Sequence, residues 1–528
     1  MAKWKPAGEE TWRDVIEWRA RLFPNKLAVV SHDTGKQFTF KELNQRANSL
    51  ANALTDLGVA KGDRVAVLAT DIPEYLEIAS TSKAGNVCVP VSWRLKEQEI
   101  VHIINDSGAN TVFVGEHYLD TIRSSRSQLP NVKRFICIDA NPDDMLSYEE
   151  LISSYPTDDP CIEVSPNDIL AIIYTSGTTG LPKGVIKTHR ESLCFIRLLD
   201  GLGQIINDDR CLFLWPMFHV GLIHANFVCI WVGATQWLIQ RFDPEAVLEI
   251  IHRAKITNLG AVPTMIIRLI EHPNRAKYDL SSLRSIIYTG SPMPTEALRK
   301  ALDIFGPILY QGFGMTEATG QTVLSVEDHI IALKKPGMER ILASVGKPFP
   351  GCEMRLVDDD DNDVPAGTPG EIVFCSDCMA EGYWNKPEET KELLKNGWMH
   401  TGDIGRLDED GYLYIVDRKK DLIVSGGENI SSKEIEDVIY THPAVLECTV
   451  IGVPSDKWGE EVKAVVALRE GMAATSEEIM NHCAEHLGGF KKPKSVEIWA
   501  ELPKNPVGKI LKREVREKFW AGRERRVH

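Results

Sequence analysis

A segment rich in hydroxyl side chains and glycines, between Tyr174 and Val185, has the composition best suited to chemistry. An apolar run with the pattern of a buried strand precedes this segment, and Lys183 lies near the end of the segment. Such a loop presents backbone N–H groups, hydroxyls and an ammonium to a polyphosphate, and its glycines let the backbone approach closely. It is not a Walker loop, because Gly184 follows the lysine; the alternative is a mobile surface turn. The predicted phosphate-binding residues are Thr175, Ser176, Gly177, Thr178, Thr179, Gly180 and Lys183.

A second short string, from Gln311 to Glu317, follows another strand-like run. Glycines bracket the aromatic ring of Phe313, and a hydroxyl and a carboxylate come shortly after. The ring can stack on a purine, the hydroxyl of Thr316 can contact a phosphate, and the carboxylate of Glu317 can bind Mg²⁺. The alternative is a core phenylalanine followed by the start of a helix. We predict nucleotide contacts from Gln311, Gly312 and Phe313, and catalytic roles for Thr316 and Glu317.

These two strings resemble the signature motifs of the adenylate-forming (AMP-binding) superfamily, which includes acyl-CoA synthetases, firefly-type luciferases and the adenylation domains of peptide synthetases. The resemblance covers nearly the whole chain, from about Thr39 to Arg513. It implies that ATP, Mg²⁺ and CoA take part in the reaction, with Glu317 as the metal ligand. It also implies that the turn Gly290, Ser291 and Pro292 faces the other side of the adenine.

The resemblance assigns three further polar residues to the nucleotide. Asp403, in a Thr-Gly-Asp motif, accepts hydrogen bonds from the ribose hydroxyls, and Arg418 contacts the ribose and a phosphate. Lys509 matches the catalytic lysine, whose cation bridges the substrate carboxylate and the α-phosphate. The family often has Thr where this chain has Asn505, and that departure leaves the assignment of Lys509 unchanged.

A glycine-rich loop in the last quarter of the chain is the expected path of CoA. Gly426 and Gly427 resemble the loop that lines the pantetheine tunnel once a C-terminal domain has swung about a hinge at Lys420. Glycines suit that role because a thin cofactor arm must pass close to the backbone. A plain hairpin turn is the alternative.

The acyl pocket is the part of the site that the sequence defines least. His219 stands where the family places an aromatic residue or a histidine beside this pocket, so we include it among the catalytic residues, although nothing supports proton transfer by it. Val262, Gly290 and Gly314 are expected to line the same pocket, and both glycines to leave it open. With no fixed charge to pair with an amino group, the pocket favours an apolar acid, fatty or aromatic, over an amino acid.

Composition narrows the remaining choices. The 528 residues require at least two domains, and a net charge of −15 argues against a nucleic-acid partner. No stretch has the length and apolarity of an integral membrane segment, so we expect a cytoplasmic protein. The 11 cysteines are expected to be reduced, and the pair Cys375 and Cys378 lacks the second pair that a zinc site needs. If the chain self-associates, a homodimer is the expected form.

The order of apolar runs predicts an α/β fold with two domains. Strand and helix patterns alternate up to Glu317, which implies α/β subdomains with mostly parallel sheets, and a β-rich region follows. We place the large N-terminal domain, with the ATP and acyl sites, at residues 1–417. Residues 418–528 form a small mobile α+β domain that carries the catalytic lysine.

The resemblance implies an ATP-dependent acyl-CoA ligase. Such an enzyme converts a carboxylic acid, here a medium- or long-chain fatty acid or an aromatic acid, to acyl-AMP with release of pyrophosphate. It then transfers the acyl group to the thiol of CoA and releases AMP. The alternative is a stand-alone adenylating enzyme that loads a carrier-protein thiol. A luciferase-like oxygenase and a catalytically dead nucleotide-binding scaffold are weaker alternatives, and the scaffold disagrees with the presence of both Lys509 and Glu317.

Overall fold

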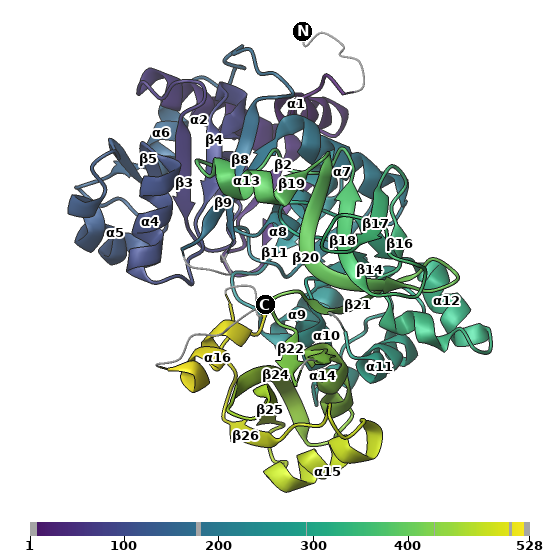
Figure 1. Ribbon diagram of the computed structural model, residues 1–528. Coiled ribbons are helices and arrows are strands. Elements are labelled where there is room, and N and C mark those ends of the chain that lie inside the picture. The colour runs from purple at the N-terminus through teal and green to yellow at the C-terminus, as the bar shows by residue number, and fades with distance from the viewer. Residues whose placement is uncertain (1–7, 176–180, 292, 427, 506–508, 522–528) are drawn as a thin grey trace.

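The computed structural model describes residues 8–175, 181–291, 293–426, 428–505 and 509–521. Two large sheets with parallel cores, a small antiparallel sheet and a separate C-terminal sheet organise this part of the chain. Figure 1 shows the C-terminal sheet and its helices, olive to yellow, as a unit below the rest. The arrangement confirms the α/β fold class, with a large N-terminal part and a small C-terminal part.

Seven strands form the first sheet, in the order β7-β6-β5-β3-β4-β8-β9. Its neighbours are parallel except β8 and β9, which are antiparallel. Its inner strands are almost wholly buried, as expected for a sheet covered on both faces. The strands are β3 (Arg64–Leu68), β4 (Val87–Pro90), β5 (Thr111–Val114), β6 (Arg134–Cys137), β7 (Leu146–Ser147), β8 (Ile169–Thr175) and β9 (Lys183–Thr188). The helices that precede or connect them are α2 (Phe40–Asp56), α3 (Glu74–Ala79), α4 (Glu97–Ser107), α5 (Leu119–Ser125) and α6 (Tyr148–Ser154).

Nine strands form the second sheet, in the order β16-β15-β14-β13-β12-β10-β11-β1-β2. The strands are β1 (Leu27–Ser31), β2 (Gln37–Thr39), β10 (Arg210–Phe213), β11 (Thr235–Leu238), β12 (Asn258–Ala261), β13 (Ser285–Thr289), β14 (Leu309–Phe313), β15 (Thr322–Leu324) and β16 (Lys347–Pro348). The helices are α1 (Trp12–Leu22), α7 (His189–Gly201), α8 (Val220–Val232), α9 (Pro244–Ala254), α10 (Pro263–Ile270), α11 (Thr295–Phe305) and α12 (Val326–Lys334). Strands β1 and β10 to β14 pair in parallel, and the remaining pairs are antiparallel.

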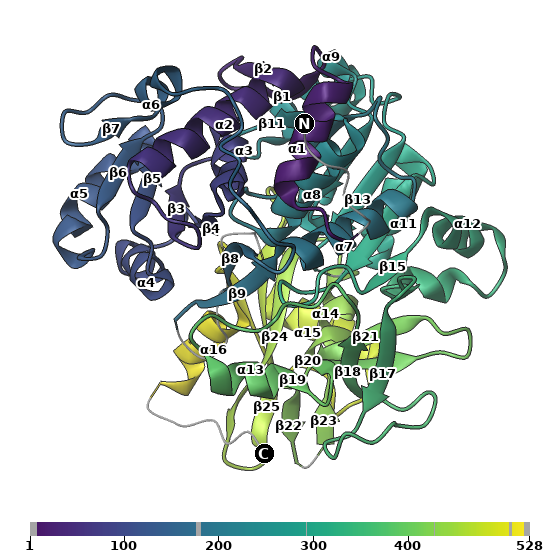
Figure 2. The same ribbon diagram turned by 90° about the horizontal axis from the view of Figure 1, so that it is seen from above.

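One apolar core joins the two large sheets. Val67 of β3 and Phe213 of β10 belong to the same buried cluster, so the sheets share their packing. Helix α1 closes this core beside α8 (Figure 2). The Trp12 ring stacks on the Phe227 ring of α8 with ring centroids 3.7 Å apart. Within the described chain, no helix combines the length and the apolar character that crossing a membrane requires.

The third sheet is antiparallel and corresponds to the predicted β-rich region. Its strands are β17 (Glu353–Val357), β18 (Gly370–Cys375), β19 (Leu394–Lys395), β20 (Trp398–Leu407) and β21 (Leu413–Arg418), with α13 (Pro387–Leu393) beside them. The acidic run after β17 forms the hairpin loop between β17 and β18, in which Asp358 accepts hydrogen bonds from the backbone N–H groups of Asp360 and Asn362.

The fourth sheet belongs to the C-terminal unit. Its strands are β22 (Ile423–Ser425), β23 (Glu428–Ile430), β24 (Val445–Ser455), β25 (Gly459–Leu468) and β26 (Ser495–Trp499). The helices are α14 (Ser432–Tyr440), α15 (Ser476–His486) and α16 (Lys512–Trp520). The chain passes from the third sheet to the fourth between Arg418 and Ile423, next to the predicted boundary at residue 418.

Local signals in the sequence explain several element ends. Thr39 caps α2, since its hydroxyl accepts from the Glu42 backbone N–H at 3.2 Å while the Glu42 carboxylate accepts from the Thr39 backbone. Gly58 follows the helix with a φ of +75°, the left-handed conformation that glycine adopts without strain. Helix α16 begins at Lys512, shortly after Ile510, which forms an isolated β-bridge with Lys504.

Candidate active site

The predicted phosphate loop joins two antiparallel strands at one edge of the first sheet. Thr175 ends β8, Lys183 begins β9, and the two residues face each other in register. The sheet therefore fixes both ends of the loop, whereas the predicted residues Ser176 to Gly180 lie outside the described part of the chain. The Lys183 ammonium lies 5.3 Å from the centroid of the Tyr383 ring.

Tyr383 also contacts the predicted metal ligand, Glu317. Its hydroxyl donates a hydrogen bond of 2.6 Å to Glu317 Oε1, and Glu317 is only 6% exposed. Burial, together with the neighbouring carboxylate, raises the pKa of Tyr383, so the phenol stays protonated at neutral pH and remains a donor. The Glu317 carbonyl accepts from the Ala380 backbone N–H at 2.7 Å. Tyr383 thus links the end of the phosphate loop to the predicted metal ligand.

Sequence reasoning missed Tyr383. It lies between Gly382 and Trp384 in a segment to which we assigned no chemistry, and a single tyrosine carries no motif of its own. The structure brings it to the site through an isolated β-bridge to Val185, which follows the phosphate loop. The sequence signal closest to Tyr383 is Pro387, which marks the start of a helix. It indicates that the segment is ordered, but it does not show which residue Tyr383 contacts.

The donor set at Glu317 suits Mg²⁺. The Tyr383 hydroxyl donates a hydrogen bond to Oε1 of Glu317, and no hydrogen bond within the described chain is made to Oε2. The half-buried hydroxyl residue Thr316 directly precedes the carboxylate. The described residues contain no cluster of three or more His, Cys, Asp or Glu that could hold a metal. A single carboxylate beside a phosphate site fits Mg²⁺, which typically binds one or two carboxylates together with substrate phosphates.

The predicted purine site lies where β13 and β14 end. Gly290 has a φ of +92°, and a Cβ atom there would meet only Val262 Cγ1, at 3.5 Å. A Cβ atom on Gly312 would meet only the Thr289 hydroxyl oxygen, at 4.0 Å. Both glycines therefore leave open space where a flat ring can lie against the backbone.

Phe313, the predicted stacking residue, is half-buried at the end of β14. Its ring centroid lies 6.2 Å from that of Phe374 on β18, so the second and third sheets meet beside the predicted purine site. Ser291 is half-buried in the turn after Gly290, and Pro292 lies outside the described residues.

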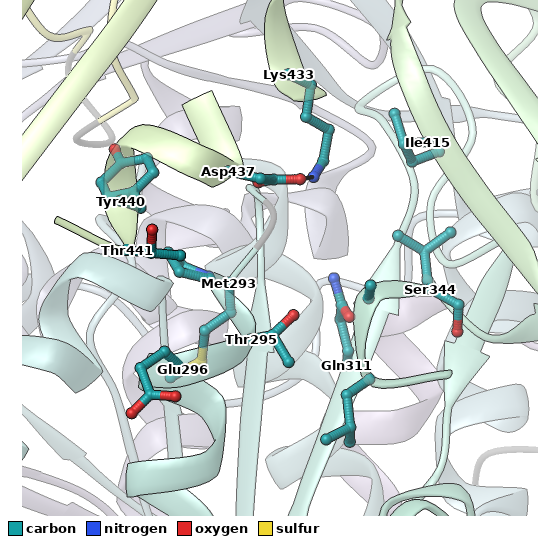
Figure 3. Close-up of a pocket in the computed structure, with 14 residues that line it drawn as sticks. Met293, Thr295, Glu296, Gln311, Ser344, Ile415, Lys433, Asp437, Tyr440 and Thr441 are labelled. Carbon is teal, nitrogen blue, oxygen red and sulfur yellow. Dashed lines mark hydrogen bonds and ion pairs between the residues drawn. The ribbon is translucent and has the colours of Figure 1, made fainter. Parts of the chain in front are cut away.

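A cavity of about 160 Å³ opens beside the predicted nucleotide residue Gln311 (Figure 3). The side chains of Gln311 and Thr295 border it from the N-terminal part. Helix α14 of the C-terminal unit borders it from the other side, where Lys433 and Asp437 form an ion pair of 2.5 Å. The shape of this cavity therefore depends on the orientation of the C-terminal unit.

Asp403 and Arg418 pair across two neighbouring strands. Strands β20 and β21 place them opposite each other in register, with Arg418 Nε 3.2 Å from Asp403 Oδ1. The Asp403 side chain is 15% exposed and that of Arg418 is 41% exposed. Burial raises the pKa of Asp403, and Arg418 opposes that shift. The strand register thus brings two predicted ribose contacts together.

Hydrogen bonds to Asn505 hold the backbone of Lys509. Lys504 and Ile510 form an isolated β-bridge. Between them, the Asn505 N–H donates to the Lys509 carbonyl at 2.7 Å, and the Lys509 N–H donates to Asn505 Oδ1 at 2.8 Å. Asn505, which stands where the family often has Thr, therefore has a structural role. Its amide oxygen anchors the backbone of Lys509, the predicted catalytic lysine.

The Lys509 ammonium interacts electrostatically with Arg418 and Asp403. Its side chain keeps solvent-accessible surface, yet desolvation by the surrounding protein and repulsion from Arg418 lower its pKa to about 8. Asp403 and Asp421 act in the opposite direction. Anionic substrates that bind beside Lys509 would raise this pKa and keep the lysine charged.

His219 has a structural partner at the start of α8. It is the N-cap residue of the helix, and its Nδ1 accepts a hydrogen bond of 3.1 Å from the Gly221 N–H. Burial lowers the pKa of His219 to about 4, so the imidazole is neutral at pH 7. The structure thus assigns one ring nitrogen of His219 to capping the helix.

Gly314 differs from the prediction that it leaves the acyl pocket open. A Cβ atom there would lie 2.6 Å from the Gly320 nitrogen and 2.8 Å from the Ala318 carbonyl oxygen. Glycine is required at this position because the backbone folds back on itself, which a sequence pattern cannot distinguish from an open pocket.

Gly426 adopts the conformation of a tight turn. Its φ is +63°, and its N–H donates to the Trp458 carbonyl at 2.8 Å. A Cβ atom there would lie 2.9 Å from Trp458 Cε3. Gly427 lies outside the described residues.

Comparison with known proteins shows which family this chain resembles. The family model of the AMP-binding enzymes matches residues 16–384, and that of the AMP-binding enzyme C-terminal domain matches residues 434–509. A feruloyl-CoA synthase from Amycolatopsis sp is 37% identical over 507 residues, which cover 95% of this chain and 97% of that protein. The long-chain-fatty-acid–CoA ligase FadD13 of Mycobacterium tuberculosis is 36% identical over 512 residues, covering 96% and 98%.

A relative with another acceptor and a solved structure extend the comparison. The fatty acid–[acyl-carrier-protein] ligase ScoC of Streptomyces coeruleorubidus is 34% identical over 527 residues, covering 98% of each chain. The crystal structure of the anthranilate CoA ligase AuaEII in complex with anthranoyl-AMP has a TM-score of 0.89 and 29% identity, covering 97% of this chain and 98% of that one. These matches confirm the resemblance that the sequence motifs indicated: the chain belongs to the AMP-binding enzyme family.

Proposed function

We propose that this protein is an AMP-forming acyl-CoA ligase. It uses ATP to convert a carboxylic acid to acyl-AMP with release of pyrophosphate, and then transfers the acyl group to the thiol of CoA with release of AMP. Relatives named as CoA ligases for fatty and aromatic acids support this assignment. The carrier-protein alternative is not favoured by these relatives.

The observation that carries the proposal is the grouping of Lys509 with the paired residues Arg418 and Asp403. In the first step a carboxylate oxygen attacks the α-phosphorus, and the bond to the bridging oxygen of pyrophosphate breaks. Two anions must meet for this to happen, so catalysis consists mainly of charge neutralisation and in-line positioning. Lys509 and Arg418 supply positive charge where the anions meet, and Asp403 orients the ribose through its hydroxyls.

Glu317 is the residue that would hold Mg²⁺, with Thr316 beside it. The bound ion would neutralise charge on the phosphates. Tyr383 positions these groups. Its hydroxyl donates a hydrogen bond of 2.6 Å to one carboxylate oxygen of Glu317, and the Lys183 ammonium lies over its ring. The predicted phosphate loop would bind the same triphosphate through its backbone N–H groups.

The second step requires another arrangement around the acyl carbonyl. We assign residues 1–417 to an N-terminal domain and residues 418–528 to a C-terminal domain that reorients about Lys420. The change of sheet between Arg418 and Ile423 supports a hinge there. After reorientation, Gly426 and Gly427 would line the path of the CoA thiol, which attacks the carbonyl carbon while AMP leaves.

The acid is proposed to be a fatty or aromatic carboxylic acid. Among the described residues that the sequence places at the acyl pocket, Val262 and Gly290 are uncharged, and His219 is neutral because its pKa is about 4. A Cβ atom at Gly290 would lie 3.5 Å from Val262 Cγ1, so these two predicted pocket residues adjoin each other. A buried apolar surface gains about 25 cal/mol per Å² from excluding water, which favours longer acyl groups.

A screen of acids with two acceptors tests this assignment. Pyrophosphate release is measured for alkanoic acids of increasing length and for benzoate- and cinnamate-type acids, each with CoA or with a phosphopantetheinylated carrier protein. We expect release to depend on the acid, and thioester to form on CoA. Thioester that forms only on the carrier protein would contradict the choice of CoA.

Replacing Glu317 with Gln is expected to reduce activity through the metal. The amide has nearly the same shape but no charge, so the Mg²⁺ concentration for half-maximal pyrophosphate release should rise, and excess Mg²⁺ should restore part of the rate. A titration with Mg²⁺ at fixed ATP measures both effects. If the Mg²⁺ dependence is unchanged, the Glu317 carboxylate has a purely structural role.

The pH profile of the free enzyme should report Lys509. Its pKa is lowered to about 8, and the reaction needs the charged form, which predominates below that pH. We therefore expect kcat/KM for adenylate formation to fall as pH rises through about 8. A profile with ATP below its KM, in a buffer series of constant ionic strength, measures this fall. A kcat/KM that stays level up to pH 10 would contradict it.

A further inference from the structure

A buried ion pair lies beside the segment of the predicted metal ligand. Lys187 Nζ on β9 is 2.5 Å from Glu191 Oε1 on α7, and the two side chains are 1% and 5% exposed. Burying two charges removes their hydration, which offsets much of their attraction, so such a pair is weak support for stability alone. The position of the pair is informative, since β9 is the strand that leaves the phosphate loop at Lys183.

The lysine of this pair reaches across to the segment that carries Glu317. Lys187 Nζ donates a hydrogen bond of 3.1 Å to Thr319 Oγ1, and Thr319 is 8% exposed. Thr319 stands two residues after Glu317, in the connection between β14 and β15. One buried ammonium thus joins the strand after the phosphate loop, the first turn of α7 and the segment of the predicted metal ligand.

The same segment is pressed against α7 by its backbone. Gly320 has a φ of +60°, and a Cβ atom there would overlap the Phe195 ring of α7. Within the segment, the Met315 N–H donates to the Ala318 carbonyl at 2.9 Å, and the Ala318 N–H donates to the Met315 carbonyl at 3.2 Å. The segment is therefore a compact turn docked on α7, and Lys187 adds a hydrogen bond from β9 to this contact.

We propose that Lys187, paired with Glu191, is a positioning residue for metal-bound ATP. Through Thr319 it holds the Glu317 segment at a fixed place relative to the phosphate loop, while Tyr383 holds the Glu317 carboxylate from the other side. Mg²⁺ demands nearly ideal octahedral geometry, so a small shift of its carboxylate ligand weakens binding. The inference rests on the proposed function, in which Glu317 serves the metal.

The direct test removes the acceptor of Lys187 and leaves the ion pair intact. Thr319→Val has the same shape without the hydroxyl, and Thr319→Ser keeps the hydroxyl. Binding of ATP without acid is measured by calorimetry in the presence of Mg²⁺ and again with a chelator. In Thr319→Val we expect affinity for ATP with Mg²⁺ to fall by about tenfold or more and affinity for metal-free ATP to change by less than about twofold. Thr319→Ser should behave like the wild type.

Two further variants keep the test decisive. Thr322→Val removes another buried hydroxyl, on β15, which donates to the Val345 carbonyl at 2.6 Å; it should lower thermal stability without changing the advantage that Mg²⁺ gives to ATP binding. The double variant Lys187→Met with Glu191→Leu replaces the whole pair by apolar side chains, so it should fold and still lose this advantage.

The outcomes separate the inference from the proposed function. If Thr319→Val and the double variant both keep the full advantage of Mg²⁺ while Glu317→Gln loses it, the positioning role of Lys187 is wrong and the metal role of Glu317 stands. If Glu317→Gln also keeps the advantage, the metal role is wrong, and the inference falls with it. If Thr319→Val and Thr322→Val lose the Mg²⁺ advantage to the same extent, the contact between Lys187 and Thr319 contributes only general packing. That result would also overturn the inference.

Discussion

Lys509→Ala is expected to slow acyl-adenylate formation by about 10²–10³-fold, because the attacking carboxylate loses a preorganised cation. In the structure the Lys509 ammonium interacts electrostatically with Asp403 and Arg418, beside which the ribose and the α-phosphate are proposed to lie. The fold should persist, since the side chain is exposed and the turn around it is held by backbone contacts with Asn505. Acid-dependent exchange of pyrophosphate into ATP measures the step.

Two controls isolate the chemical role of Lys509. Lys504→Ala removes a lysine from the same turn, where it pairs with Glu447 at 2.7 Å, and it should leave the adenylation rate near that of the wild type. Synthetic acyl-AMP offered with CoA bypasses the first step, so Lys509→Ala should form thioester from it at close to the normal rate. A Lys509→Ala variant that exchanges pyrophosphate at the wild-type rate would show that another residue supplies the cation.

Gly426→Leu is expected to block thioester formation while leaving adenylate formation largely intact. If Gly426 lines the path of the CoA arm after reorientation, a bulky side chain there obstructs the thiol. In the structure a new Cβ atom would lie 2.9 Å from Trp458 Cε3, but Trp458 is 46% exposed and can move aside, so the crowding should not prevent folding. Acyl-AMP and acyl-CoA are quantified separately on one purified variant.

The matched control for Gly426→Leu is Gly471→Leu. Gly471 lies in the same C-terminal unit and has a φ of +76°, yet a Cβ atom there would meet nothing within 4 Å. Both substitutions place a side chain at positive φ, which costs about 1 kcal/mol or more of stability. Only Gly426→Leu should lose the second step selectively. Equal loss of both steps in both variants would make Gly426 a plain turn residue.

Local and repetitive features of the fold were predictable from the sequence. The capping box of Thr39 and Glu42, with Gly58 at the far end, defined α2, since these signals act within a few residues. The alternation of apolar strands and helices gave the parallel sheets, because only connections of that length return the chain to the same edge. The hydroxyl residues Ser431 and Thr475 mark the starts of α14 and α15 in the same way.

The parts that escaped prediction depend on contacts between distant segments. Tyr383 meets Glu317 across 66 positions of the chain, and no motif marks the pair. Lys187 meets Thr319 across 132 positions, and an isolated lysine on a strand gives no reason to expect burial. Gly314 was misread because glycine is equally suited to an open pocket and to a close backbone approach, which only the fold distinguishes.

The product balance of the complete reaction tests the account most directly. The enzyme is incubated with ATP, Mg²⁺, CoA and an acid found active in the screen, and nucleotides, phosphates and thioester are quantified together. The account predicts one AMP and one pyrophosphate for each acyl-CoA formed, and it predicts acyl-AMP and pyrophosphate when CoA is left out. Formation of ADP and inorganic phosphate instead, or thioester without AMP, would contradict it.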